Sequence, residues 1–188
     1  MKSLLIVAAI VLGCPVPQCL AQSTRSYSDP KKGFSFSYPS DFKVVTGKAA
    51  ATESWFPDQG KGEKLVKVAP VHIPTRYHGE YEFNIWISTD PPEKCGKPLP
   101  DEFETQDEKP DMATRVIDGH TFHHYSDEDA GMSKSILLEG YRTVIGKKCV
   151  QIQNTIYQAE AYDDFKPFNG KIIDKAWNKF LDSMKFTR

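Results

Sequence analysis

The sequence predicts an α+β fold, in which an antiparallel sheet built from hairpins carries a C-terminal helix across one face. Three observations predict it. Apolar and polar residues alternate with a period of two over several short segments, which is typical of half-buried strands. Tight-turn dipeptides such as Asp118-Gly119 join consecutive segments. Near the C-terminus, apolar residues recur at the spacing of one helical face.

The first 21 residues are predicted to be a cleavable secretory signal. Lys2 supplies a positive charge, an apolar run follows, and Cys19-Leu20-Ala21 has the small-x-small pattern after which signal peptidase cuts. The run is too short for a hydrocarbon core, which needs about 20 apolar residues. We therefore expect a periplasmic or secreted chain that begins at Gln22.

A second interpretation of the same segment is a lipid anchor. Residues 11–14 (Val-Leu-Gly-Cys) resemble a bacterial lipobox, in which Cys14 becomes the lipidated N-terminus. Pro15 follows this cysteine at once, and Leu12 stands where a smaller residue is usual. Cleavage after Ala21 is therefore the preferred prediction. Neither form has a transmembrane segment, because no later run is long enough.

The next elements are two short strands. Residues 22–32 are mostly polar and are predicted to be a flexible leader before a single domain over 33–188. A strand is expected over 34–38, where aromatic residues alternate with serine. Pro39-Ser40-Asp41 predicts a turn into a second strand over 42–45. Residues 46–63 lack a period and are expected to be a loop.

Two more strands are predicted in the middle of the chain. Apolar residues over 64–73 predict one, and because proline cannot donate to a sheet ladder, Pro70 indicates an edge position or a bulge. Residues 81–88 give the clearest alternation of the chain. Residues 90–111 contain many prolines and acids, and are expected to be a long excursion.

The last part of the domain contains four predicted strands and the helix. The strands cover 113–117, 121–125, 135–143 and 149–157, and Gly146-Lys147 forms the last hairpin turn. Asn169 is a suitable helix cap, and residues 185–187 form a short extension. The helix is predicted from one apolar stripe: Ile172, Ile173, Ala176, Trp177, Phe180, Leu181 and Met184.

Composition excludes one class of partner. The formal net charge is −1 over 188 residues, and loss of Lys2 with the signal changes it by one unit. A nearly neutral chain has no basic excess to hold a phosphate backbone, so we expect no nucleic-acid partner. Aromatic residues make up 12% of the chain, which favours a packed core over disorder.

The cysteines predict one disulfide. Cys14 and Cys19 leave with the signal, so Cys95 and Cys149 remain in the mature chain. Two cysteines in an exported domain most simply pair with each other. The alternative, a catalytic thiol, needs a partner histidine and an activating environment. Cys149 lies in an apolar strand and Cys95 in a proline-rich loop, so the disulfide is preferred.

The cluster His120-Thr-Phe-His123-His124 is the strongest candidate for chemistry. On a strand, His120 and His124 share one face but lie about 13 Å apart, too far to bind one metal together. A further ligand would have to come from elsewhere, for instance His72 or His78. Ordinary solvent-facing or core-edge histidines are therefore the preferred interpretation.

The acidic cluster Asp127-Glu128-Asp129 is expected to be a solvated turn. It lacks the alternating oxygen ligands and the glycine of a calcium loop. The chain also contains no G-x-S-x-G, G-x-G-x-x-G, P-loop, H-E-x-x-H or C-x-x-C motif. We expect no metal, no cofactor and no catalytic residue.

Both ends of the domain resemble the PsbP-like (Mog1/PsbP) superfamily. Residues 33–43, Gly-Phe-Ser-Phe-Ser-Tyr-Pro-Ser-Asp-Phe-Lys, are similar to its opening strand and turn. Trp177-x-x-Phe180-Leu181-x-Ser183-x-Lys185-Phe186 is similar to its last helix and final strand. For an exported bacterial member, the resemblance implies an α/β/α sandwich with flanking helices. It also implies a non-enzymatic accessory or partner-binding role, and no shared catalytic residue is carried over.

These observations predict an exported, non-enzymatic binding or accessory domain of the cell envelope, with a protein as partner. The candidate binding residues are aromatic and lie in or beside loops: Trp55, Phe56, Tyr77 and Tyr81. Ordinary packing under long loops is the other explanation for them. The alternative function is a small hydrolase or metal-dependent enzyme that uses the region from His120 to Asp129.

Overall fold

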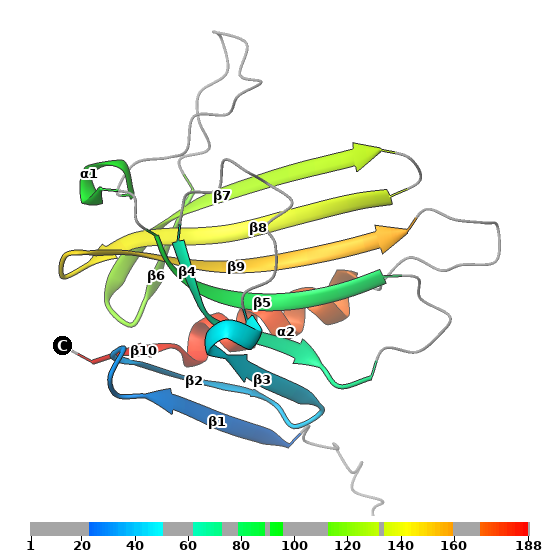
Figure 1. Cartoon of the computed structure of the whole chain (residues 1–188), viewed down its shortest axis with the longest axis horizontal. Coiled ribbons are helices and arrows are strands. Elements are labelled where there is room, and N and C mark those ends of the chain that lie inside the picture. The colour runs from blue at the N-terminus through cyan, green and yellow to red at the C-terminus, as the bar shows by residue number, and fades with distance from the viewer. Residues whose placement is uncertain are drawn as a thin grey trace, which may run out of the picture.

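The computed structural model describes residues 23–50, 62–72, 79–88, 91–95, 113–131, 134–159 and 170–187. These residues form two antiparallel sheets and one long helix (Figure 1). The small sheet contains, in spatial order, β1 (Thr24–Asp29), β2 (Phe34–Pro39) and β10 (Lys185–Phe186). The large sheet contains, in spatial order, β3 (Phe42–Thr46), β4 (Gly62–Pro70), β5 (Gly79–Ser88), β9 (Lys148–Ala159), β8 (Lys134–Ile145), β7 (His120–Gly131) and β6 (Thr114–Ile117).

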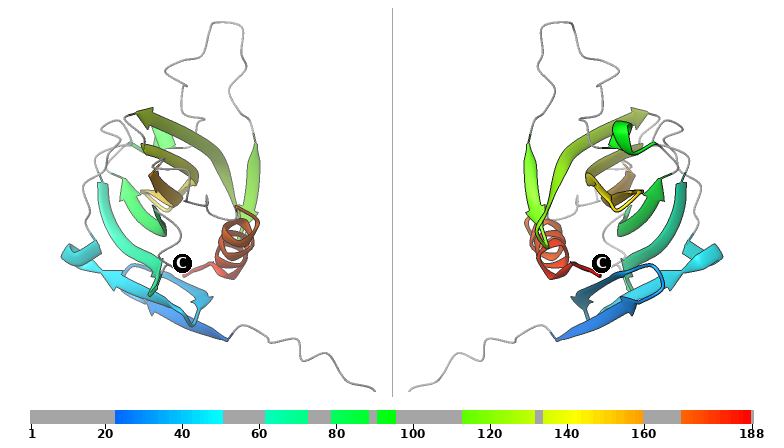
Figure 2. Two further views of the ribbon diagram at one scale, coloured as in Figure 1. Left: turned by 90° about the vertical axis from the view of Figure 1, so that its right-hand side faces the viewer. Right: turned by 90° about the vertical axis from the view of Figure 1, so that its left-hand side faces the viewer.

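The helix α2 (Gly170–Ser183) lies against one face of the large sheet, which curves around it (Figure 2). The other helical segments of the described chain are short: η1 (Gly47–Ala50), a 3-10 turn, and α1 (Pro92–Cys95). The described residues are therefore β-rich, with one helix longer than a single turn. This corrects the predicted α/β/α sandwich with flanking helices, although the antiparallel sheet and the C-terminal helix are confirmed.

The predicted flexible leader is also corrected, because residues 24–29 form β1. This strand pairs with β2 over its whole length. Its one aromatic residue, Tyr27, packs its ring 5.2 Å from that of Phe36 and 6.2 Å from that of Phe34. A single apolar residue among polar neighbours shows no alternation, so the strand could not be recognised from its own pattern.

Strand β4 is not at an edge, because β3 and β5 flank it. Pro70 is its last residue, where a missing N–H interrupts no further ladder bond. The register does shift in β4, but between Lys64 and Val66 rather than at Pro70. The expected edge or bulge at Pro70 is therefore wrong, and the chain leaves the sheet there instead.

The acidic cluster is likewise not a turn. Strand β7 continues to Gly131, and Asp127 and Glu128 stand opposite Leu138 and Leu137 of β8. Strand β8 continues to pair with β7 through these two residues, and their side chains are exposed. Their predicted exposure is thus confirmed and their predicted turn is wrong.

Both predicted two-residue hairpin turns are present. Asp118 and Gly119 join β6 to β7 with φ angles of 49° and 80°, the left-handed pair that a type I′ turn requires. Gly146 (φ 64°) begins the turn between β8 and β9. The other predicted strands are found with bounds that differ by a few residues.

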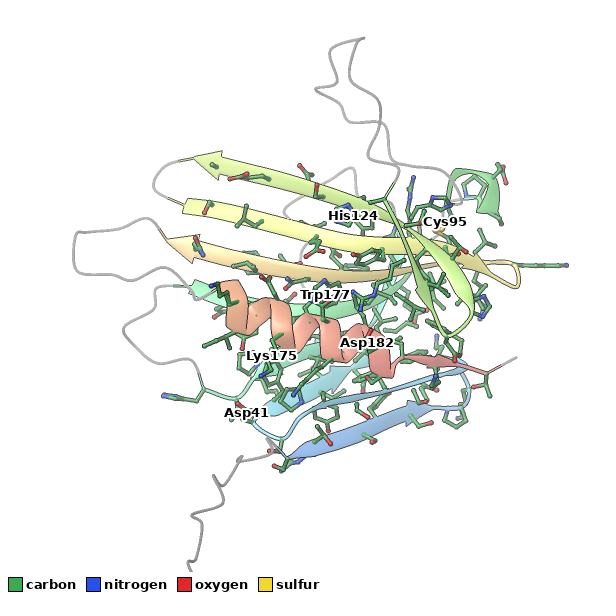
Figure 3. The ribbon with its side chains drawn as sticks, turned by 180° about the vertical axis from the view of Figure 1, so that it is seen from behind. Asp41, Cys95, His124, Lys175, Trp177 and Asp182 are labelled. Carbon is green, nitrogen blue, oxygen red and sulfur yellow. A yellow bond between two sulfur atoms is a disulfide. The ribbon has the colours of Figure 1, made fainter. Side chains whose placement is uncertain are left out.

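The main core lies between α2 and the large sheet. The apolar stripe of α2 buries Ile173, Trp177, Phe180 and Leu181. Phe83 of β5 is fully buried, with ring centroids 5.3 Å from both Trp177 and Phe180. Figure 3 shows this side of the molecule, with Trp177 labelled on α2.

Polar contacts fix both flanks of α2. Ser183 accepts a hydrogen bond from the N–H of Ser37 (2.8 Å), which ties the helix to β2. On the other flank, Arg115 of β6 donates to Asp182 and Asn178, both at 2.6 Å. Asp118 accepts hydrogen bonds from the N–H of Phe186 (2.7 Å) and from Lys185 Nζ (3.0 Å). The helix and β10 are thus fastened to both sheets.

Candidate functional site

The large sheet has an inner face, which α2 covers, and an outer face on the other side. Side chains alternate between the faces along a strand, and directly paired residues of neighbouring strands point the same way. Phe83 and Ile85 of β5 are inner residues, so Glu82, Asn84 and Trp86 are outer residues. The register then assigns each neighbouring strand to the two faces.

The outer face is polar although much of it is buried. Of the ten polar or charged side chains buried in the described part of the chain, seven belong to it. They are Glu82, Asn84, Ser88, Arg142, Gln151, Gln153 and Thr155. Burying polar groups is costly unless they find partners, so this face is a natural place to look for a site.

One end of the outer face carries the predicted disulfide. Cys95, the last residue of α1, is bonded to Cys149 of β9, and both are buried (Figure 3). The predicted pairing is confirmed. The predicted loop position of Cys95 is corrected, since it ends a one-turn helix. A bonded, buried pair leaves neither sulfur as a nucleophile.

A pocket of about 330 Å³ opens at the other end, beside the start of β3, the end of β4 and the start of β5. Ala69 lines it from the middle strand of the three, where it pairs with Lys43 of β3 on one side and lies beside Glu82 of β5 on the other. Its side chain is small, so the surrounding longer side chains leave a hollow above it. The pocket is lined by Lys43, Lys67, Ala69, Pro70, Val71, Gly79, Glu80, Tyr81 and Glu82.

A buried ion pair forms part of the pocket wall. Lys67 Nζ contacts Glu82 Oε2, and their side chains are only 19% and 4% exposed. Asn84 Nδ2 donates to the other oxygen of Glu82 at 3.0 Å. The carboxylate is therefore held by two partners. Asn84 Oδ1 is buried and has no hydrogen-bond partner among the described residues.

The rim of the pocket combines charge with apolar surface. Lys43 and Glu80 are exposed and stand on opposite sides of β4. Val71 is 63% exposed, which makes it one of three large apolar residues exposed in the described chain. The described lining therefore offers a partner both charged and apolar groups.

Two tyrosines border this region. Burial, with the nearby charge of Asp41, raises the pKa of Tyr81 to about 12. Burial, with the charges of Glu82 and Glu80, raises the pKa of Tyr157 to about 12. Both hydroxyls are therefore neutral near pH 7, and they act as hydrogen-bonding groups rather than as bases.

Of the four predicted binding residues, Tyr81 lines the pocket. Its ring also packs 5.8 Å from Phe42, so it contributes to the core as well. Trp55, Phe56 and Tyr77 lie outside the described residues.

Sequence reasoning missed Lys43, Lys67, Ala69 and Glu82. A signal was available in part, because Lys67 and Glu82 are charged residues placed within otherwise apolar strands. Only the strand pairing shows that these two charges meet. The importance of Ala69 depends on its neighbours in β3 and β5, which no local pattern predicts.

The histidines are dispersed. His120 contacts the ring of Phe186 edge-on at 5.8 Å, and His124 lies 5.3 Å from the ring of Tyr141. His124 Nε2 is 3.7 Å from Glu139 Oε1. His123, the neighbour of His124 in the strand, points to the outer face. His72 is exposed, whereas His78 and the side chain of Asp129 are not described.

Within the described ranges, no three His, Cys, Asp or Glu residues are grouped so as to hold a metal ion. In the same ranges, no helix has the length and hydropathy that are needed to cross a membrane.

The solved structures that are similar to this chain include the following two. One is the solution structure of cyanobacterial PsbP (CyanoP) from Synechocystis sp. PCC 6803, with 14% identity and a TM-score of 0.43. The match covers 93% of this chain and 98% of that one. The other is a crystal structure from Bacteroides thetaiotaomicron VPI-5482, with 9% identity and a TM-score of 0.46. It covers 87% of this chain, which spans about half (48%) of that chain.

No protein-family model and no curated protein matches the sequence. The structural neighbours include a PsbP protein.

Proposed function

We propose that this protein is an exported, non-enzymatic binding or accessory domain, and that it binds its partner at the pocket of β3, β4 and β5. The observation that carries the proposal is the composition of this pocket. A hollow over Ala69 and an exposed Val71 are flanked by the charged groups of Lys43 and Glu80.

The charges in the wall suit binding better than proton transfer. A general acid or base works best with a pKa near the operating pH. Glu82 is instead held by Lys67 and Asn84, and Tyr81 has its pKa raised to about 12. These groups would fix the shape of the site and orient a partner.

The proposed compartment rests on the disulfide together with the N-terminal sequence. Disulfides persist in oxidising compartments and are rare in the cytosol. The bond between Cys95 and Cys149 therefore supports export, which residues 1–21 predict independently. Mass spectrometry of the mature N-terminus tests this. Gln22 supports free secretion and a lipidated Cys14 supports an anchored form, whereas an intact Met1 contradicts export.

Site-specific photo-crosslinking tests the binding surface. A photoreactive residue replaces Val71 in cells that produce the protein naturally, and the matched control replaces Val116. Both valines are exposed, but Val71 follows the end of β4 and lines the pocket, whereas Val116 lies in the distant edge strand β6. We expect adducts at position 71 that exceed those at position 116. They should disappear when Ala69→Leu fills the hollow.

Substitutions in the histidine cluster separate binding from catalysis. His120→Ala, His123→Ala and His124→Ala should leave the adducts and the biological activity nearly unchanged. If a single histidine variant stays folded but loses activity, the enzyme hypothesis replaces the binding one. If Ala69→Leu leaves the adducts at position 71 unchanged, the pocket is not the binding site.

A further inference from the structure

We infer that the pocket of β3, β4 and β5 binds the zwitterion of a short peptide, with its carboxylate at Lys43 and its ammonium group at Glu80. This inference rests on the proposed function, because it names the class of ligand for the same pocket. Three observations support it: two charged groups of the pocket lack an ion-pair partner among the described residues, they lie a certain distance apart, and the pocket between them has a limited volume.

Two of the four described charged residues that line the pocket are already paired with each other. Lys67 and Glu82 neutralise each other, and Asn84 donates to the same carboxylate. Breaking a buried pair by drawing off one partner is strongly unfavourable, because it leaves an uncompensated charge. A ligand is therefore recognised by the remaining charges and not by this pair.

Among the described residues that line the pocket, the remaining charged groups are Lys43 and Glu80. Both are exposed, and neither has an ion-pair partner among the described residues. A ligand of one sign would be attracted to one of them and repelled by the other. Both are satisfied together by a ligand that carries one anionic and one cationic group.

The separation of the two charges selects the length of the ligand. Lys43 belongs to β3 and Glu80 to β5, with β4 between them. Two strand spacings amount to about 10 Å, and the register places Glu80 a further two residues, or about 7 Å, along β5, so the two backbones are about 12 Å apart. The long Lys and Glu side chains can shorten this separation. A free amino acid holds its charges too close together to reach both groups. The ends of a short extended peptide can reach both.

The surface between the charges selects the side chains of the ligand. Ala69, Pro70 and Val71 are apolar and lie along β4 and its end, between Lys43 and Glu80. The volume of about 330 Å³ is at the lower end of the range for small-ligand pockets, about 300–1,000 Å³. Small apolar side chains on a di- or tripeptide fit these limits.

Isothermal titration calorimetry with the whole mature protein tests the inference. The ligands are Ala-Ala-Ala, its N-acetylated form, its C-terminal amide and free alanine. We expect Ala-Ala-Ala to bind best. Each cap should weaken binding about two- to fivefold, which is the value of one exposed ion pair of up to about 1 kcal/mol. Free alanine should bind more weakly than either capped peptide.

Two variants assign the ends of the peptide. Lys43→Gln should abolish the penalty of the C-terminal amide and keep that of the N-acetyl group. Glu80→Gln should do the reverse. Both side chains are exposed, so neither substitution is expected to unfold the domain. Lys147→Gln, in the exposed turn between β8 and β9, is the matched control and should change nothing.

The outcomes distinguish this inference from the proposed function. Equal binding of capped and uncapped peptides, or no effect of Lys43→Gln on the amide penalty, overturns the inference. If no peptide binds but position 71 still crosslinks in an Ala69-dependent way, the inference fails and the pocket remains a binding surface for another ligand. If the crosslinks do not depend on Ala69, the proposed function fails, whatever the peptides do.

Discussion

The two faces of the large sheet are both buried in part, but they are buried with different chemistry. The inner face carries Phe83, Ile85 and Ile152, which pack against the apolar stripe of α2. On the outer face, the residues next to these in the chain are Glu82, Asn84, Gln151 and Gln153, which are also buried. One strand thus supplies an apolar core on one side and a polar layer on the other.

The two faces therefore contribute differently to the stability of the domain and to the geometry of the candidate pocket. Apolar contacts are non-directional, so the inner face contributes stability in proportion to the area that it buries. Buried polar groups contribute little net stability even when paired, but they fix specific geometry. The candidate pocket accordingly lies on the outer face, where a buried ion pair shapes its wall.

The largest expected effect tests the inner face. Phe83→Ala should lower the free energy of unfolding by about 3–5 kcal/mol, because a fully buried aromatic ring is lost from the cluster under α2. Thr155→Val, which keeps the shape of a buried side chain on the outer face, is the matched control and should change it by no more than about 1.5 kcal/mol. Urea unfolding measures both. Equal losses would contradict the division between the two faces.

The disulfide of the outer face should come next. Replacing Cys95 and Cys149 together by serine should lower the free energy of unfolding by about 2–4 kcal/mol, because the bond closes a long loop and restricts the unfolded chain. The sequence separation of the pair is 54 residues. Thermal unfolding of the variant, and of the wild-type protein under reducing conditions, should show the same decrease. A variant with unchanged stability would show that the bond contributes nothing to folding.

Packing within the outer face can be tested at Gly140. A Cβ atom at this position would lie 2.3 Å from the ring of Tyr125, which covers the glycine from β7. Tyr125 is buried, which raises its pKa well above the ordinary value, although the charge of Arg142 opposes this. Gly140→Ala should therefore cost about 1–3 kcal/mol of stability through overpacking. Gly170→Ala, where the structure has open space, is the control and should be close to neutral.

The smallest expected effect concerns Asp118, which accepts hydrogen bonds from both residues of β10. Hydrogen bonds from the N–H of Phe186 and from Lys185 lower the pKa of Asp118. A carboxyl group with a lowered folded-state pKa adds stability above its unfolded pKa of about 4, and loses it as the pH falls through the folded value. Asp118→Asn should therefore destabilise the domain at pH 7 and much less at pH 2. Urea unfolding at both values measures this, and an equal difference would contradict the assigned role.

Much of the fold could be predicted from the sequence because its elements have strong local patterns. The alternation over 81–88, the turn at Asp118-Gly119 and the apolar stripe of the helix each depend on neighbouring residues alone. The predicted disulfide followed from counting the cysteines that remain after removal of the predicted signal. Local patterns failed where an element depends on its partner: β1 has one aromatic residue, and β7 extends through acidic residues opposite Leu137 and Leu138.

The candidate site shows the same limit. Tyr81 was predicted as a binding residue from its aromatic character and its place beside a loop, and it lines the pocket. The pocket itself joins Lys43, Lys67 and Glu82 from three strands, and their register is set by pairing between distant segments.

The alternation of the strands, the amphipathic helix and the pair Cys95 and Cys149 can be read from residue type and spacing alone. The packing of the folded chain is needed to know which face of each strand α2 covers, that Lys67 contacts Glu82, and that the small side chain of Ala69 lies between longer ones. A period of two defines two faces of a strand but does not identify the partners of either face. The partners are chosen by strand order and register, which depend on the packing of the whole chain.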